Sequence, residues 1–332
     1  MIPSQLNLPE WDNIAAAKAR ETQAKHDKTR GGLGRLEDIV IQMAGIQALA
    51  EPLAEPAATL LFSCDHPVAV NNQLSKLAKT YTETNFKHIK MGTSSSSIQS
   101  RILGAQLKPI DLNNELGFEN DFTKGDALTE ELFSKAFYVG YKAVKEFDEK
   151  VKVLITGDLG YGSTTVAAAT AAALLPDMPP AALVGRGSGL IGESLKKKIS
   201  LVEEAVNSFR SLKGQVSIPA WKASLLKFAG FDILAMLGAM AAGCERQMLV
   251  MVDGFANSVS ALALVQWQPA ARRFLLFSQL SAEKGHGVVL DALMAEPLLR
   301  LNLRHGEAAG SLLAYQIVQQ AALLHKKLAL LD

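Results

Sequence analysis

Short apolar runs alternate along this chain with longer segments in which apolar residues recur at helical spacing. The apolar runs predict strands at residues 58–64, 107–112, 151–156, 181–184, 248–252 and 273–277. Most of these runs end in turns rich in Gly, Asp or Ser. Because the strands are apolar on both faces and are separated by helices, the pattern is typical of a parallel sheet that is covered on both sides.

The helical spacing predicts helices between these strands and at both ends of the chain. The ranges are 129–147, 164–175, 193–212, 231–243 and 258–266, two helices within 9–47 that are broken at 31–34, and 288–304 and 310–331. Both ends lack strands, so we expect them to pack together as a small helical domain. The expected division is an amino-terminal helical segment (1–55), an α/β domain (56–287) and carboxyl-terminal helices (288–332) that complete the small domain.

Composition adds limits on the class of protein. With 332 residues, 48 % hydrophobic and 20 % charged, the chain is typical of a globular protein of about two domains. A net charge of +1 without a long basic run argues against a nucleic-acid binder. No apolar run reaches the ~20 residues of a membrane span and no signal peptide is visible, so we expect a cytoplasmic protein. Cys64 and Cys244 are expected to be buried thiols.

Candidate chemistry gathers where the predicted strands end. In parallel sheets, ligands bind beyond the carboxyl ends of the strands, where loops can reach them. Those ends carry Asp65-His66, Asp158-Leu159-Gly160, residues 185–189, Asp253-Gly254 and Ser281. We therefore expect a site for a small molecule there. No second His or Cys stands at metal spacing near His66, so no metal site is expected.

The turn at residues 157–165 is the richest of these strand ends, because it joins a strand to a helix through three glycines. Backbone N–H groups at the helix start, with the hydroxyls of Ser163 and Thr164, would suit a phosphate. The alternative is a tight turn in which one of these hydroxyls caps the helix, and the residues alone leave both open. The turn has neither a Walker ending nor a clean dinucleotide fingerprint.

Three further features have an ordinary structural interpretation. Lys198 ends a run of three lysines, and such a run is usually a solvated helix face. Glu307 stands in a glycine-flanked turn, where a lone Glu is more often a helix cap. The four serines at 94–97 predict a polar and mobile patch. Residue patterns alone therefore predict an α/β protein with a pocket that suits a phosphate.

Seven pieces of the sequence match one enzyme family in order and spacing. They are Gly32-Leu33-Gly34-Arg35-Leu36-Glu37, Asp65-His66, Gly157-Asp158-Leu159-Gly160, Gly230-Phe231-Asp232, Asp253-Gly254-Phe255, Ser281-Ala282-Glu283-Lys284-Gly285 and Gly306-Glu307. From about residue 28 onward the chain thus resembles the nicotinate-nucleotide:dimethylbenzimidazole phosphoribosyltransferases, which make the lower-ligand nucleotide of cobalamin. The resemblance implies a Rossmann-like parallel sheet with a small helical domain, a homodimer, and no metal or cofactor.

The resemblance also implies an activity and a set of site residues. Enzymes of this family move phosphoribose from nicotinate mononucleotide to a base nitrogen, release nicotinate and invert the anomeric centre. Glu307 falls on the position of the general base, and Asp158 falls on a second acidic residue beside the ribose. The positions that line the ribose and phosphate are Gly160, Gly187, Lys198, Gly254 and Ser281.

The stretch from Pro67 to Ser97 departs from the family pattern. It lacks the Gly- and Pro-containing segment that helps to form the base pocket, and Asn85 is the nearest candidate for an acceptor-contacting Gln. Asp158 also replaces the usual Glu. The donor half of the site is therefore expected to be intact and the acceptor half altered. The resemblance does not decide whether the acceptor is a benzimidazole, a purine or a phenol. It also leaves two alternatives: that the chain works in a heteromeric complex, or that it is a non-catalytic partner subunit.

Overall fold

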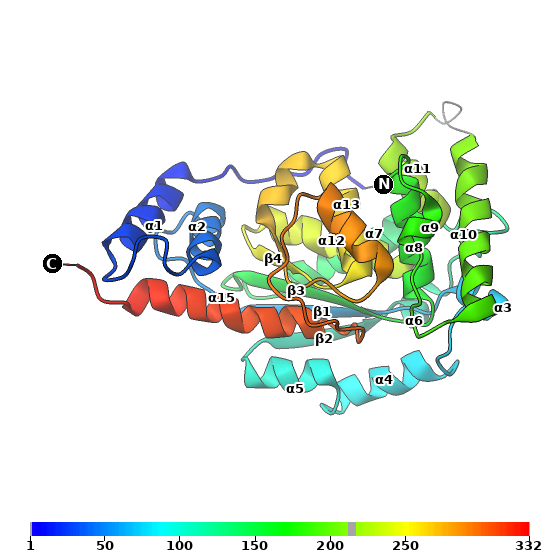
Figure 1. The fold of residues 1–332 in the computed structure, drawn as a ribbon, viewed down its shortest axis with the longest axis horizontal. Coiled ribbons are helices and arrows are strands. Elements are labelled where there is room, and N and C mark those ends of the chain that lie inside the picture. Colours follow the sequence, from blue (N-terminus) through cyan, green and yellow to red (C-terminus); the bar gives the residue numbers. More distant parts are fainter. Residues whose placement is uncertain (1, 212–216, 332) are drawn as a thin grey trace.

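The protein is described by a computed structural model that covers residues 2–211 and 217–331. Within these residues the chain forms a five-stranded parallel sheet in the order β2-β1-β3-β4-β5 (Figure 1). The strands are β1 (Ala57–Ser63), β2 (Gln106–Asp111), β3 (Val153–Leu159), β4 (Leu249–Val252) and β5 (Leu275–Phe277). The predicted α/β fold with a parallel sheet is confirmed.

Helices pack on both faces of this sheet, which explains why its strands are apolar on both sides. On one face lie α12 (Phe231–Glu245) and α13 (Phe255–Trp267), with α7 (Glu130–Lys145) and α8 (Ser163–Leu174) packed beside them. The opposite face is covered by α15 (Ala309–Lys327), with α4 (Tyr81–Lys90) and α5 (Ser95–Ile102) alongside β2 (Figure 1). None of the described helices is long and apolar enough to cross a membrane.

Helices from the two ends of the chain meet at one end of the molecule, where α2 (Arg35–Gln47) packs against α15 (Figure 1). A hydrogen bond of 2.9 Å joins Gln23 Nε2 to His325 Nδ1, and the backbone N–H of Asp27 donates to the carbonyl of Ala329. The two chain ends are thus in contact, while the division into domains stays a prediction. The remaining helices are α1 (Asn13–Lys25), α3 (Pro67–Asn72), α6 (Leu112–Leu116), α9 (Pro180–Leu183), α10 (Gly192–Ser211), α11 (Ala220–Phe228), α14 (Lys284–Ala292) and the 3-10 helix η1 (Pro269–Phe274).

Two predicted elements are wrong. The apolar run 181–184 is not a strand, because it belongs to the short helix α9, with Pro180 at its first position. A run of four apolar residues does not distinguish the two structures. The predicted helix 288–304 ends near Ala292, and beyond it Leu299 runs beside Ser278, whose carbonyl accepts its backbone N–H. Pro297 removes a donor and prevents the helix from continuing.

Smaller differences concern the ends of elements. Arg273, predicted as the first residue of a strand, lies in η1 instead. Leu212, predicted as the end of a helix, lies outside the described residues. Cys64 and Cys244 are buried and not paired with each other, as predicted.

Candidate active site

The carboxyl ends of β3, β4 and β5 open into one cavity, as the strand-end argument predicts. Seven of the predicted site residues line it: Asp158, Gly160, Ser163, Thr164, Gly187, Gly254 and Ser281. The sequence analysis missed other residues of the wall, among them Tyr81, Gln279, Glu283 and His305. Gln279 and Glu283 follow β5 and could have been found by the same argument, whereas no local signal marks Tyr81.

The turn after β3 is held tightly against the end of β1. A Cβ atom at Gly160 would lie 1.8 Å from the carbonyl oxygen of Cys64, so only glycine fits there. One carboxylate oxygen of Asp65 accepts from the backbone N–H of Tyr161 at 2.9 Å and from the hydroxyl of Thr82. Asp65, predicted to contact substrate, is not part of the cavity wall and instead fixes this turn.

Helix α8 begins at the cavity without a side-chain cap. Its N-cap is Gly162, at φ 103°, and neither Ser163 nor Thr164 caps the backbone N–H groups. The capping alternative for these two hydroxyls is therefore wrong. Thr164 Oγ1 accepts a hydrogen bond of 3.0 Å from the ammonium of Lys198. A helix N-terminus and a cation thus meet at one point, which suits an anion.

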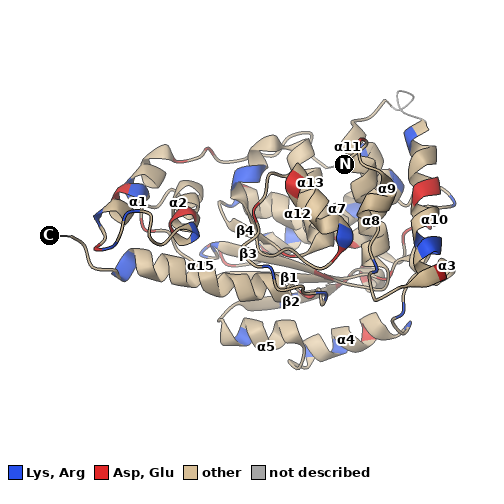
Figure 2. Ribbon diagram, in the orientation of Figure 1, with Lys and Arg blue, Asp and Glu red and all other residues tan. Residues whose placement is uncertain are grey.

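Lys198 is fully buried, although the two lysines that precede it are exposed. Figure 2 shows acidic and basic positions interspersed along α10, which carries it. The solvated-face interpretation holds for Lys196 and Lys197 but is wrong for Lys198, whose ammonium also donates to Gly185 O at 3.2 Å. Burial lowers the pKa of Lys198 to about 8, against the opposing charge of Glu283. An anion at this position would favour the charged form.

Gly187 lets the backbone approach this cation closely. Its φ of +51° is in the left-handed region, and a Cβ atom would lie 2.6 Å from Thr164 Oγ1 and 3.3 Å from Lys198 Nζ. A side chain at Gly187 would therefore fill the space above the ammonium. Thr164 and Gly187 line the cavity, and the buried ammonium of Lys198 lies directly behind them. This arrangement suits an anion, and we call these three residues the candidate anion subsite.

Glu307 lies at a strained turn next to the end of β3. Gly306, Glu307 and Ala308 have φ values of 72°, 56° and 57°, and the last two cost about 1–3 kcal/mol each as non-glycine residues. The N–H of Glu307 donates to the carbonyl of Asp158 at 3.0 Å, which joins the turn to the end of β3. The helix-cap interpretation of Glu307 is wrong, because the N-cap of α15 is Ala308 and has no side-chain cap.

The Glu307 carboxylate is only 1 % exposed. Its Oε2 accepts from Ser96 Oγ at 3.2 Å and lies 3.7 Å from Nε2 of His305. This contact raises the pKa of His305. Tyr81 lies nearby on α4, where burial and then the charges of Glu307 and Asp158 raise the pKa of its phenol.

Two more carboxyl groups stand at the ends of β3 and β4. Burial, with the neighbouring charges of Asp232 and Asp253, raises the pKa of Asp158 to about 7, and burial raises the pKa of Asp253 to about 6. Asn257 Nδ2 donates to Asp158 at 3.0 Å. Burial thus favours the protonated form of both acids.

Three buried acceptor atoms at the cavity have no hydrogen-bond partner within the described residues. They are Asp253 Oδ2, Gln279 Oε1 and Glu283 Oε2. Unpaired buried acceptors are costly, so a ligand that supplies hydroxyl donors would be stabilised here. The cavity wall thus offers a group of acceptors that suits a sugar. Lys198 and Glu307 are not part of the wall: both are buried next to wall residues, Lys198 beside Thr164 and Glu307 beside Gly306.

Ser281 is oriented from behind by a buried histidine. The N–H of Ser281 donates to Nδ1 of His286 at 3.0 Å, so this nitrogen carries no proton. The other ring nitrogen, Nε2, then donates to Ser258 Oγ at 2.9 Å. Burial lowers the pKa of His286 to about 3, which keeps the ring neutral.

Because His286 is buried in its neutral form, the free energy of unfolding should depend on pH. In the unfolded chain its pKa is about 6.5, so its contribution is complete above that pH and is lost as the pH falls toward 3. We expect it to lower the free energy of unfolding by about 1.4 kcal/mol per pH unit below pH ~6. Urea unfolding at pH 7 and pH 5 measures this loss. His286→Asn, which keeps an acceptor for Ser281, should reduce the loss, whereas the exposed His88→Asn should not. Equal losses in wild type and His286→Asn would contradict the assignment.

His66, predicted to bind substrate, lies outside the cavity wall in a buried network. Its Nδ1 lies 2.6 Å from Glu119 Oε1 and its Nε2 lies 3.2 Å from Asp232 Oδ2. Burial would lower the pKa of His66, but the charges of Asp232 and Glu119 outweigh it and raise the pKa well above its usual value. His66 therefore joins β1 to α12 as a buried cation between two carboxylates.

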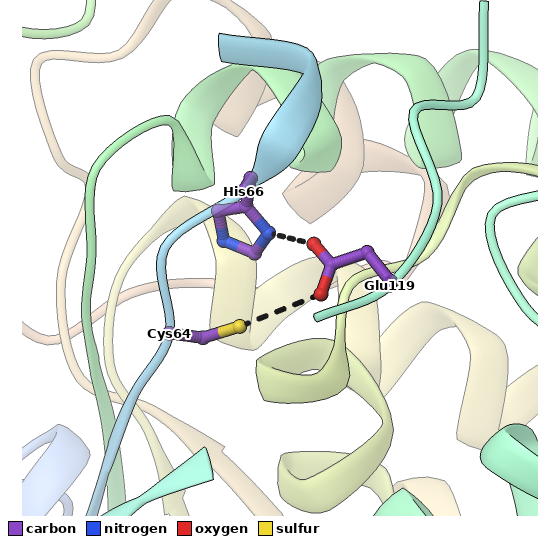
Figure 3. A group of neighbouring side chains, drawn as sticks. All are labelled: Cys64, His66 and Glu119. Atoms are coloured by element: carbon purple, nitrogen blue, oxygen red, sulfur yellow. Dashed lines mark hydrogen bonds and ion pairs between the residues drawn. The ribbon is translucent and has the colours of Figure 1, made fainter. Parts of the chain in front are cut away.

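Cys64, His66 and Glu119 also bring three metal-ligating atoms within 4.8 Å of one another (Figure 3). The distance of 2.6 Å between His66 and Glu119 is that of a hydrogen bond, whereas two tetrahedral zinc ligands lie about 3.3 Å apart. Hydrogen bonding thus accounts for this group. Asn85, the predicted acceptor contact, is also outside the cavity wall, and its amide donates to the carbonyl of Tyr81.

Comparison with known proteins gives one consistent result. A family model described as phosphoribosyltransferase matches residues 8–332. A nicotinate-nucleotide–dimethylbenzimidazole phosphoribosyltransferase of Bradyrhizobium sp. (strain BTAi1) is 36 % identical, with 97 % of this chain and 96 % of the relative covered. The enzyme of the same name from Pseudomonas aeruginosa (strain LESB58) is 34 % identical, with 96 % and 93 % covered. The solved structure of CobT from Thermus thermophilus has a TM-score of 0.86 at 27 % identity, with 94 % and 96 % covered.

Proposed function

This chain belongs to the phosphoribosyltransferase family, and on that premise we propose that it transfers phosphoribose from nicotinate mononucleotide to a benzimidazole-like base. Nicotinate is released, and the product is the lower-ligand nucleotide of a cobamide. The names of the relatives support this reaction over nearly the whole chain.

One observation in the cavity carries the proposal. Lys198 donates to Thr164 at the start of α8, Glu307 is joined to the end of β3 through Asp158, and the unpaired acceptors of Asp253 and Gln279 lie in the cavity wall. A donor with a phosphate at one end and a reacting sugar carbon at the other matches this order of groups. Lys198 and Thr164 would bind the phosphate, and the acceptors would bind the ribose hydroxyls.

The proposed reaction requires a general base for the acceptor and a group that stabilises the positive charge developing on the sugar. Nicotinate leaves from a cationic pyridinium, so its departure needs no strong acid. The bond between the sugar and nicotinate breaks as the base nitrogen attacks, and Glu307 takes the proton that the base loses. Asp158, as a carboxylate, would stabilise the positive charge that develops on the sugar.

We also propose that the enzyme acts as a homodimer in the cytoplasm. Exposed apolar side chains on α5, Ile98 and Ile102, and Leu323 on the adjacent α15 support an interface on this face. Sedimentation equilibrium measures the assembly. A monomer at micromolar concentration would contradict the dimer but not the reaction.

The experiment for the reaction is nicotinate release from nicotinate mononucleotide, with dimethylbenzimidazole, adenine, phenol or p-cresol as acceptor. Release that depends on dimethylbenzimidazole, with the ribosylated base as product, is the expected result. Release with a phenol alone would replace the proposed acceptor by a phenolic one. Donor binding without release under every acceptor would contradict the enzymatic proposal and favour a partner subunit.

A further inference from the structure

Residues 94–97 do not form the mobile polar patch that their composition predicts. Ser94 is the N-cap of α5, and its Oγ accepts from the N–H of Ser97 at 3.1 Å. Ser94, Ser96 and Ser97 are all buried, and Ser96 is 0 % exposed. Four small polar residues therefore begin a helix against the Glu307 turn.

The buried hydroxyls form a chain that ends on the Glu307 carboxylate. Ser97 Oγ donates to the carbonyl of Ile89 at 2.8 Å, and Ser94 Oγ lies 2.8 Å from Ser97 Oγ and 2.9 Å from Ser96 Oγ. Ser96 Oγ lies 3.2 Å from Glu307 Oε2. The chain thus links the end of α4, the start of α5 and the start of α15.

The direction of the last hydrogen bond follows from the number of protons. Each hydroxyl has one proton, and an ionised carboxylate only accepts. The proton of Ser97 goes to a carbonyl, which only accepts, and the proton of Ser96 goes to Glu307. Ser94 can then donate to Ser96 or Ser97 without conflict. Each of the three serine hydroxyls in this hydrogen-bonded series therefore has a partner when Glu307 is charged.

Among the hydrogen bonds and ion pairs of the described residues, two side chains contact the Glu307 carboxylate, Ser96 and His305. Of these, only Ser96 donates a hydrogen bond whatever the pH. His305 approaches Oε2 to 3.7 Å, but its side chain is 45 % exposed and carries charge only when protonated. Tyr81 faces Glu307 from α4. Asp158 and Asp253, at the ends of β3 and β4, add negative charge that opposes ionisation of a nearby carboxyl when they are themselves charged.

We propose that Ser96 is a positioning residue for Glu307: its hydroxyl fixes the orientation of the carboxylate and stabilises its charged form, so that the base is ready when the acceptor arrives. This inference rests on the proposed function, since it takes Glu307 as the base of that reaction. A buried carboxylate needs a hydrogen-bond donor in place of water. The strained backbone of the 306–308 turn restricts the Glu307 side chain from reaching another donor.

The test compares Ser96→Ala with Ser100→Ala. Ser100 lies one turn further along α5, is 2 % exposed, and its hydroxyl has no partner within the described residues. Both variants remove one buried hydroxyl from the same helix, but only one of these hydroxyls reaches Glu307. We expect Ser96→Ala to lower kcat about 10-fold or more, the effect of losing a hydrogen bond to a charged group, with unchanged KM for nicotinate mononucleotide. Ser100→Ala should keep the wild-type kcat.

The pH profile separates positioning from a general loss of structure. Without the Ser96 hydroxyl the carboxylate is protonated more easily, so the acidic limb of kcat should move to higher pH in Ser96→Ala. Because His305 titrates nearby, both serine variants are also measured in a His305→Gln background, where the shift should persist. Because acid also lowers stability through His286, each rate is divided by the folded fraction measured at the same pH.

The outcomes distinguish this inference from the proposed function. A wild-type protein that releases no nicotinate overturns the function, whatever the variants do. An active wild type with the same kcat and pH profile in Ser96→Ala overturns the inference alone. A lower kcat with an unmoved acidic limb also overturns it, since a purely structural role would give that result. A lower kcat with a shifted limb in Ser96→Ala but not in Ser100→Ala supports it.

Discussion

Replacing Glu307 by Gln is expected to lower kcat by about 10²–10⁴-fold, the range of general base catalysis. The amide keeps the size of the side chain and can still accept from Ser96, but it cannot take a proton from the acceptor. Donor affinity should stay close to that of the wild type, because the candidate anion subsite at Lys198 is separate from Glu307. Steady-state nicotinate release and calorimetric binding of nicotinate mononucleotide measure the two quantities.

A matched control for this variant is Glu296→Gln. Glu296 is exposed at 70 % and pairs with Arg35 on the surface. It should retain wild-type kcat and donor affinity. Full activity in Glu307→Gln would remove Glu307 from the role of base, and a loss of donor binding would mean that the carboxylate contributes to the donor site instead.

Replacing Lys198 by Ala should weaken donor binding by about 10- to 100-fold, as expected for one hydrogen bond to a charged group. The buried ammonium is the cation of the candidate anion subsite, and Thr164 and the start of α8 remain to bind part of the phosphate. Lys198→Arg should restore the affinity poorly, because the larger guanidinium does not fit beside Gly187. Calorimetry with nicotinate mononucleotide and with nicotinate riboside separates the phosphate contribution.

Lys196→Ala is the control for this variant, because Lys196 is 73 % exposed on the same helix and pairs only with Glu193 among the described contacts. Its donor affinity should equal that of the wild type. If Lys198→Ala weakened the riboside as much as the mononucleotide, Lys198 would not be the phosphate ligand.

The same lysine predicts a pH dependence of donor binding. The pKa of Lys198 in the free protein is about 8, so its charge is lost as the pH rises through that value. Donor affinity should therefore fall between pH 7 and pH 9 in the wild type. The fall should be smaller in Lys198→Ala, where the titration of Asp158 near pH 7 remains. A fall of equal size in both proteins would assign the pH dependence to another group.

Several parts of the site follow from local sequence. The strand ends at Asp158, Gly254 and Ser281 line the cavity because parallel strands all deliver their carboxyl ends to one edge of the sheet. The glycine-rich turn at 157–165 opens a helix on that cavity, as its residues predict. Glu307 and Lys198 were singled out only through the family resemblance, since their local patterns favoured a helix cap and a solvated face.

The sequence by itself determined the five strands, the longer helices and the edge of the sheet where the cavity lies, because these depend on the periodicity of neighbouring residues. Only the tertiary structure decided which polar residues are buried and what they contact. Ser96 meets Glu307 across 211 positions, and His66 meets Asp232 across 166. Their local sequence predicted a mobile polar patch for Ser96 and a substrate contact for His66. In the fold both residues are buried against a partner that is distant in the sequence. No local pattern can reveal such a contact.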